Sequence, residues 1–132
     1  MIKRIDHIAV AVKSLDETLE VFKSVFGVEV SHTETIPDQG VKAALIKIGD
    51  GEIEFIEPVD PEGGVAKFIE RRGEGIHHIC LEVDNIEETL NSLAANGVAL
   101  IDKKPRKGLA GMIGFVHPKS TKGVLFELAE KV

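Results

Sequence analysis

Two histidines and two glutamates lie in segments with the alternating pattern of β-strands, and their spacing pairs them. His7 lies in the segment 5–12 and His78 in the segment 76–83, an offset of 71 positions. Glu54 and Glu127 each lie between apolar neighbours in a later strand-like segment, at the similar offset of 73. A glutamate in the middle of a strand is unfavourable unless it has a partner. One explanation covers all four residues, namely a bound metal ion.

Imidazole and carboxylate groups are donors for divalent ions such as zinc, cobalt, nickel, iron and manganese. The sequence therefore predicts one divalent-metal site made by His7, Glu54, His78 and Glu127. Four such ligands leave coordination positions for water or substrate, which is typical of a catalytic site rather than a closed structural one. Glu52 shares the strand face of Glu54 and is the alternative ligand in the first half.

The remaining three histidines have no counterpart at the corresponding position of the other half. His77 directly precedes His78 and competes with it, but only His78 aligns with His7. His32 and His117 have no matched partner. We expect these two to be structural or exposed to solvent.

The repeat continues beyond the histidine strands into two helices that begin alike. Ser14 with Glu17, and Asn85 with Glu88, have the spacing of a helix N-cap residue and a glutamate three positions later. Apolar residues then recur at helical spacing in both halves. Each half therefore opens with a strand and a capped helix.

Each helix is followed by a glycine suited to the C′ position, Gly27 or Gly97, and then by further strands. In the first half we predict strands at 28–33, 41–48 and 52–57, with a hairpin turn at 49–51. In the second half we predict strands at 99–102, 112–117 and 124–128. Both halves are thus βαβββ modules, at about 1–57 and 76–132, joined by a linker at 58–75 that contains a short helix at 65–72. The predicted fold class is α+β, in a single domain spanning 1–132.

Composition limits the classes of partner. The chain has 132 residues and a net charge of −6, which argues against nucleic-acid binding because that requires a basic face. No apolar run approaches the roughly 20 residues needed to cross a bilayer, and the N-terminal residues lack a signal-peptide core. The single Cys80 cannot form an intramolecular disulfide, so a cytoplasmic location is expected. A local basic segment, with Lys103, Lys104, Arg106 and Lys107, is either a solvated loop or an anion-binding rim.

Duplicated βαβββ modules with these ligands resemble the vicinal oxygen chelate superfamily, which includes glyoxalase I, extradiol dioxygenases and methylmalonyl-CoA epimerases. The likeness is strongest to the methylmalonyl-CoA epimerase family, through the segments 6–12, 37–41 and 75–79 and through His117-Pro118-Lys119-Ser120 with 123–128. The resemblance implies a cupped mixed sheet around the metal. It also implies a homodimer and a divalent ion, preferably cobalt, with zinc, nickel, manganese and magnesium as alternatives.

The resemblance further implies interconversion of (2R)- and (2S)-methylmalonyl-CoA, by proton abstraction at C2 through a metal-stabilised enolate. Glu127 matches the family glutamate that binds metal and serves as a base. The opposite-face base is open: the stretch 41–44 has no carboxylate, so Glu54, a bound water or a loop residue could serve. Gln39, Lys119 and Ser120 are the expected substrate contacts, and the lysines are candidates for the coenzyme A phosphates. The alternatives are a glyoxalase I-like lyase or a dioxygenase on the same scaffold, or a non-catalytic small-molecule-binding protein.

Overall fold

The computed structural model describes residues 1–109 and 111–132. The chain divides into two compact units. The first unit is His7–His77. The second unit combines Met1–Asp6 with His78–Val132. Strand β1 (Ile2–Ala11) therefore contributes its first residues to the second unit and the remainder to the first.

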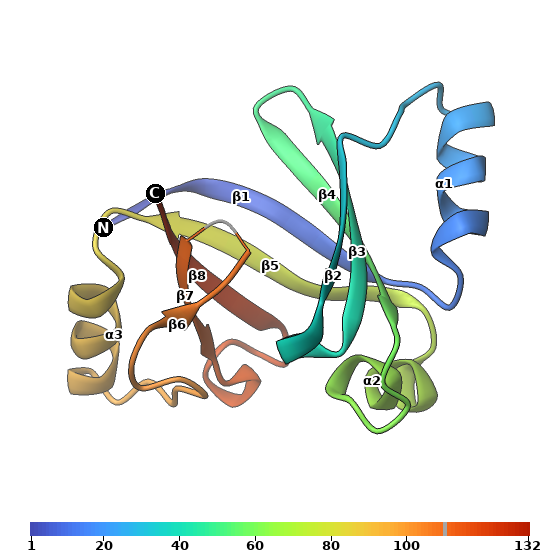
Figure 1. Cartoon of the computed structure of the whole chain (residues 1–132). Helices are drawn as coiled ribbons and strands as arrows, with labels where there is room; N and C mark the ends of the chain where they lie inside the picture. The colour runs from blue at the N-terminus through green and yellow to red at the C-terminus, as the bar shows by residue number, and fades with distance from the viewer. Residues whose placement is uncertain (110) are drawn as a thin grey trace. The chain divides into compact units, whose positions relative to one another are not determined.

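The first unit is a four-stranded mixed sheet with two helices (Figure 1). Its elements after β1 are α1 (Leu15–Ser24), β2 (His32–Ile36), a 3-10 turn η1 (Pro37–Gln39), β3 (Val41–Ile48), β4 (Gly51–Pro58) and α2 (Gly64–Arg72). The strands lie in the order β2-β3-β4-β1. Strands β2, β3 and β4 are antiparallel, and β1 runs parallel to β4.

The second unit repeats this arrangement. Its elements are β5 (Gly75–Val83), α3 (Ile86–Ala95), β6 (Arg106–Lys107), β7 (Gly111–Val116), a 3-10 turn η2 (Pro118–Ser120) and β8 (Leu125–Lys131). The order is β5-β8-β7-β6, with β5 parallel to β8 and the other pairs antiparallel. The element order β1-α1-β2-β3-β4 followed by β5-α3-β6-β7-β8 confirms the two predicted βαβββ modules and the α+β class. Among the described residues, no helix combines the length and apolar character needed to cross a membrane.

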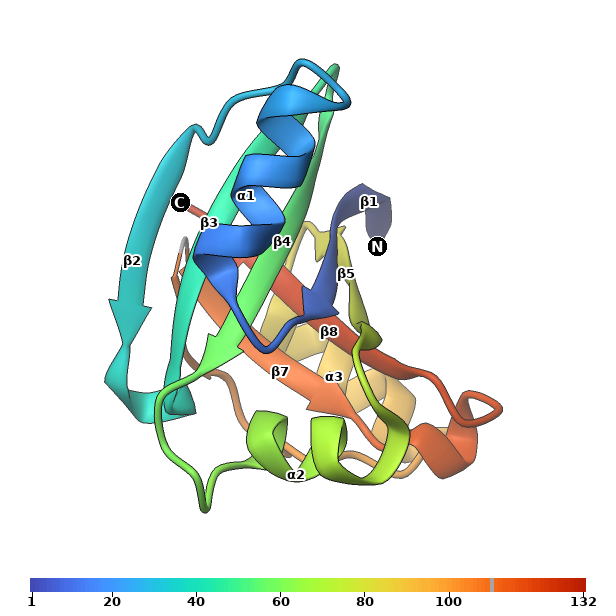
Figure 2. The ribbon, with the colours of Figure 1, turned by 90° about the vertical axis from the view of Figure 1, so that its right-hand side faces the viewer.

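In each unit the helix that follows the first strand covers one face of the sheet, and the predicted ligands lie on the opposite face. Helix α1 packs against β3 and β4 through a core that includes Leu15, Ile46 and Phe55 (Figure 2). Helix α3 packs in the same way against β7 and β8, around Leu90 and Leu128. Because successive strand residues point to opposite faces, the alternation in the sequence decides which residues meet the helix.

The helix starts are capped as predicted, and a second pair of matched contacts supports them. The Ser14 side chain accepts a hydrogen bond from the Glu17 amide at 3.2 Å, and Asn85 accepts one from the Glu88 amide at 3.0 Å. In addition, the first amide of each helix donates to a glutamate on the last strand of its own module. These bonds join Leu15 N to Glu57 Oε1 at 2.6 Å and Ile86 N to Glu130 Oε1 at 2.9 Å. The carboxylates therefore meet unsatisfied amides at the positive end of each helix.

The predicted strand at 28–33 is wrong in position. The Val28 amide donates to the carbonyl of Phe22 at 3.0 Å, so the chain is still bonded to the end of helix α1 there. The strand begins only at His32, where pairing with β3 starts.

The predicted strand at 99–102 is also wrong. Among residues 1–109 and 111–132, this stretch forms an isolated bridge between Leu100 and Val116 and no strand, and β6 lies further along, at Arg106–Lys107. The Asp102 side chain accepts the hydrogen bond of the Phe115 amide at 2.8 Å, in the place where a strand would offer a backbone carbonyl. A side chain thus replaces the backbone ladder at this point.

Candidate metal centre

The first unit brings together its predicted histidine and glutamate. His7 Nε2 on β1 lies 3.5 Å from Glu54 Oε1 on β4. Glu54 is only 6% exposed, whereas Glu52 is less deeply buried. Ala9 and Ala11 follow His7 on the same face and are fully buried, so small side chains surround the imidazole on its own strand. This geometry favours Glu54 over Glu52 as the partner of His7.

The second unit contains the matching pair. His78 Nε2 on β5 lies 3.1 Å from Glu127 Oε1 on β8, and both residues are buried. The ring of Phe115 on β7 meets the His78 ring edge-on, with the centroids 5.5 Å apart and the planes at 88°. This contact limits the rotation of the imidazole, so that its Nε2 stays directed toward Glu127.

The donor atoms in each unit fit a divalent ion. Ligands about 2.1 Å from a metal lie about 3.0 Å apart at a right angle and about 3.4 Å apart at a tetrahedral angle. The observed separations of 3.1 and 3.5 Å between nitrogen and oxygen are close to these values. Buried imidazole beside buried carboxylate is also the donor chemistry that first-row divalent metals prefer. Each unit thus contains one histidine and one glutamate whose donor atoms suit a divalent ion.

The other candidates lie in turns and at the surface. Gln39 ends η1 in the first unit and is partly buried. In the second unit, Lys119 is exposed in η2, and the Ser120 hydroxyl accepts a hydrogen bond from the Ala99 amide at 2.9 Å. The structure therefore gives Ser120 a role in holding its loop, and leaves the Lys119 side chain on the surface.

The unmatched histidines are exposed, as predicted. His32 contacts Glu34 at 3.1 Å, and the Nδ1 atom of His117 accepts the amide of Lys119 at 3.0 Å, which caps η2. His77 packs its ring against Phe68 of helix α2, with the centroids 4.9 Å apart. These contacts give all three histidines local structural roles.

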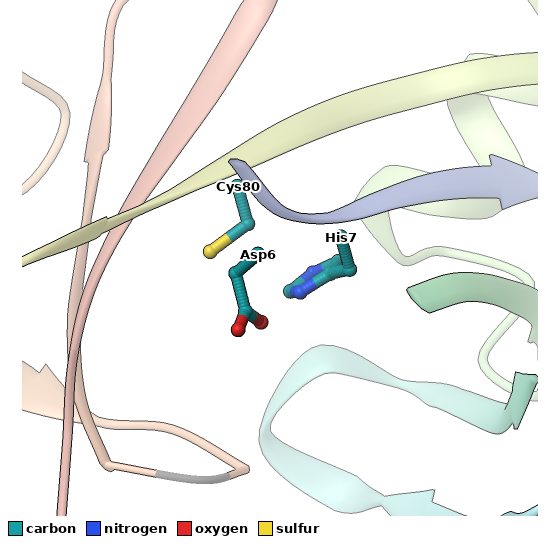
Figure 3. Close-up of side chains that lie close together, drawn as sticks. All are labelled: Asp6, His7 and Cys80. Carbon is teal, nitrogen blue, oxygen red and sulfur yellow. The ribbon is translucent and has the colours of Figure 1, made fainter. Parts of the chain in front are cut away.

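Asp6 is a buried carboxylate that sequence reasoning missed. It is 6% exposed, and its Oδ1 atom accepts hydrogen bonds from Lys131 Nζ at 2.8 Å and from Arg4 at 3.2 Å. Its carboxylate also lies within 4.8 Å of the Cys80 sulfur, and both side chains are drawn in Figure 3. Asp6 directly precedes His7, so its cations hold the backbone that carries a predicted ligand. The sequence signal was an aspartate inside a strand, directly before the predicted ligand His7.

We expect Asp6→Asn to lower the free energy of unfolding by about 1–3 kcal/mol, because two cations would lose a buried charged acceptor. Chemical denaturation at neutral pH measures the change. Asp50→Asn, in the exposed β3–β4 turn, is the control, with an expected effect within about 0.5 kcal/mol. Equal stability of the two variants would contradict the structural role of Asp6.

The sequence matches the family model of the glyoxalase/bleomycin resistance protein/dioxygenase superfamily over residues 6–115. That range includes both predicted histidines, Glu54 and most of both modules. The chain therefore belongs to this superfamily.

Methylmalonyl-CoA epimerases are among the proteins that this chain is similar to. The chain is 37% identical to the mitochondrial methylmalonyl-CoA epimerase of Dictyostelium discoideum, over 98% of this chain and 80% of that protein. It is 38% identical to an uncharacterized protein of Bacillus subtilis, over 96% of this chain and 91% of that one. A solved structure of methylmalonyl-CoA epimerase in complex with methylmalonyl-CoA and NH4+ aligns over 100% of this chain and 96% of its own, at 35% identity and a TM-score of 0.94. These likenesses confirm the family and the glyoxalase-like fold expected from the sequence.

Proposed function

We propose that this protein is a metal-dependent epimerase that interconverts (2R)- and (2S)-methylmalonyl-CoA. The observation that carries the proposal is the matched histidine–glutamate pair in each module. The likeness to epimerases over nearly the whole chain supports the choice of substrate. The reaction removes a proton from C2, which lies between a thioester carbonyl and a carboxylate, and returns a proton to the opposite face.

The residues that would hold the metal are His7, Glu54, His78 and Glu127. A divalent ion there would supply Lewis-acid stabilisation, worth several kcal/mol, for the negative charge that develops as the proton leaves C2. Cobalt is our preferred ion, since the likeness to the epimerase family favours it, and zinc, nickel, manganese and magnesium have compatible charges. Glu54, His78 and Glu127 are buried and the His7 side chain is only 14% exposed, which supports an environment where electrostatic effects are strong.

Inversion at C2 needs one group to take the proton and another to deliver one. We assign the first role to Glu127, whose carboxylate is oriented by His78 at 3.1 Å. We assign the second to Glu54, which lies in the corresponding place beside His7. Positioned carboxylates of this kind typically contribute about 10²–10⁴-fold to proton transfer.

The proposal extends to the substrate contacts and the assembly. Gln39, Lys119 and Ser120 would contact the acyl-CoA, and the exposed ammonium group of Lys119 suits a coenzyme A phosphate. Exposed apolar side chains at the end of α1, Val25 and Phe26, support a homodimer that covers them. We also propose that the protein is located in the cytoplasm.

Deuterium incorporation tests this function directly. With methylmalonyl-CoA in heavy water, we expect the metal-loaded protein to catalyse the entry of deuterium at C2, and we expect chelation to stop it. Proton NMR or mass spectrometry follows the exchange, and the slow exchange in buffer alone is the control. A fully metallated protein that leaves C2 unexchanged would overturn the proposal.

A further inference from the structure

The basic segment contains one cation whose position differs from that of its neighbours. Arg106 on β6 is paired with Ile113 on β7. Two residues further along β7, Phe115 is paired with Glu127 on β8. Since paired residues and alternate residues along a strand project to the same face, Arg106 lies on the face that carries His78 and Glu127. Helix α3 covers the opposite face of these strands.

The Arg106 side chain is held in place while the end of its guanidinium remains available. Its Nε atom donates to Asp102 Oδ1 at 3.0 Å, and its guanidinium carbon lies 5.5 Å from the centroid of the Phe115 ring. The other oxygen of Asp102 accepts the Phe115 amide, so one carboxylate fixes both residues. The side chain is 40% exposed, and within 1–109 and 111–132 its terminal nitrogens have no hydrogen-bond partner. They therefore present oriented donors to the solvent.

The position of Arg106 relates it to the metal ligands of its own unit. The Phe115 ring contacts both the guanidinium and His78, each with a separation of 5.5 Å. The guanidinium therefore lies within about 11 Å of the His78 ring. By contrast, Lys103, Lys104 and Lys107 are exposed and have no ion pair among the described residues. Lys107, which directly follows Arg106, projects to the other face of the strand.

We propose that Arg106 binds the free carboxylate of the acyl group, and so selects malonyl-type thioesters over neutral acyl-CoA molecules. This inference rests on the proposed function and names a determinant of its specificity. A guanidinium matches a carboxylate through two parallel hydrogen bonds, which an ammonium group does not. The contact with Phe115, whose ring also meets His78, favours the acyl end of the substrate, because the long pantetheine arm separates the phosphates from the thioester.

Binding measurements with Arg106→Gln, Arg106→Lys and Lys107→Gln test the assignment. Calorimetry would compare methylmalonyl-CoA, propionyl-CoA (which lacks the carboxylate) and free coenzyme A, all on the metal-loaded protein. We expect Arg106→Gln to weaken methylmalonyl-CoA binding by about 10- to 100-fold and to leave the other two ligands unchanged. Arg106→Lys should recover part of the loss, because it restores the charge without the planar fork. Lys107→Gln removes the same charge from the other face of the same strand and should keep the wild-type ratio of methylmalonyl-CoA affinity to propionyl-CoA affinity.

Three outcomes would overturn the proposal. Unchanged methylmalonyl-CoA binding in Arg106→Gln would remove the contact, and equal weakening of all three ligands would assign Arg106 to the coenzyme A phosphates. Loss of bound metal in Arg106→Gln would show that the residue acts only by supporting Phe115 and His78, so metal content is measured beside binding. Failure of the proposed function would appear as an absence of methylmalonyl-CoA turnover in the wild-type protein. Failure of the Arg106 assignment would appear only in the variants.

Discussion

Glu127→Gln is expected to lower the rate of C2 proton exchange by about 10²–10⁴-fold, the contribution that a positioned carboxylate makes to proton transfer. The glutamine keeps the shape of the side chain and an oxygen near His78, but it has no basic carboxylate. Deuterium exchange at C2 is measured at saturating metal, starting separately from the (2R) and the (2S) epimer. The two measurements give the rate of proton removal from each face of C2. Glu130→Gln is the matched control, because it lies on the same strand and contacts helix α3 instead of His78.

The roles proposed for Glu127 and Glu54 also predict a difference between the two epimers. If Glu127 and Glu54 serve opposite faces, Glu127→Gln slows exchange from one epimer most strongly and Glu54→Gln slows it most strongly from the other. Variants that slow both epimers equally would point to a single base, with water as the second proton carrier. Full-rate exchange in Glu127→Gln would exclude this residue from proton transfer.

His78→Ala is expected to remove metal binding and to lower kcat/KM by about 10³-fold or more, since several kcal/mol of charge stabilisation would be lost. Binding of an ion to the folded state alone also raises stability, by about 2.7 kcal/mol at a metal concentration one hundred times Kd. The Tm of the wild type should therefore rise on addition of cobalt or zinc, and the Tm of His78→Ala should not. His117→Ala, which changes an exposed histidine, should respond as the wild type does.

The same measurement tests whether the two modules share one ion. With four ligands on one ion, His7→Ala and His78→Ala each abolish the metal-dependent rise in Tm, and the wild type binds one equivalent of metal per chain. Two separate sites would instead leave each single variant with one bound ion and part of the rise. That outcome would contradict the shared centre and, with it, the proposed role of the metal.

Local features of the sequence predicted much of the fold. The N-caps at Ser14 and Asn85, and the turn at 49–51, depend on side chains and backbone within a few residues, so their signals are complete in short stretches. The close histidine–glutamate pairs were predictable for a different reason. The duplication placed each histidine and glutamate in a second, independent copy, and that repetition is visible without a structure.

Long-range contacts account for what sequence reasoning missed. The stretch 99–102 is mostly apolar, as a buried strand would be, but the Asp102 side chain takes the hydrogen bond that a strand would accept through its backbone. The Asp6–Lys131 pair joins residues 125 positions apart, and the place of Arg106 on the ligand face depends on the register of three strands. No local pattern encodes such pairings, because they depend on which strands become neighbours.

The matched helix contacts of Glu57 and Glu130 have a consequence for how accurately the two ligand strands are aligned. Each lies three residues after a predicted ligand, Glu54 or Glu127, and so on the opposite face of the strand. A slip of one residue would exchange the two faces. It would separate the carboxylate from its histidine and remove the helix amide's acceptor in the same step. A misaligned strand would therefore lose two favourable interactions at once. The folding energy of each module thus favours the register that places its glutamate beside its histidine, independently of any metal ion.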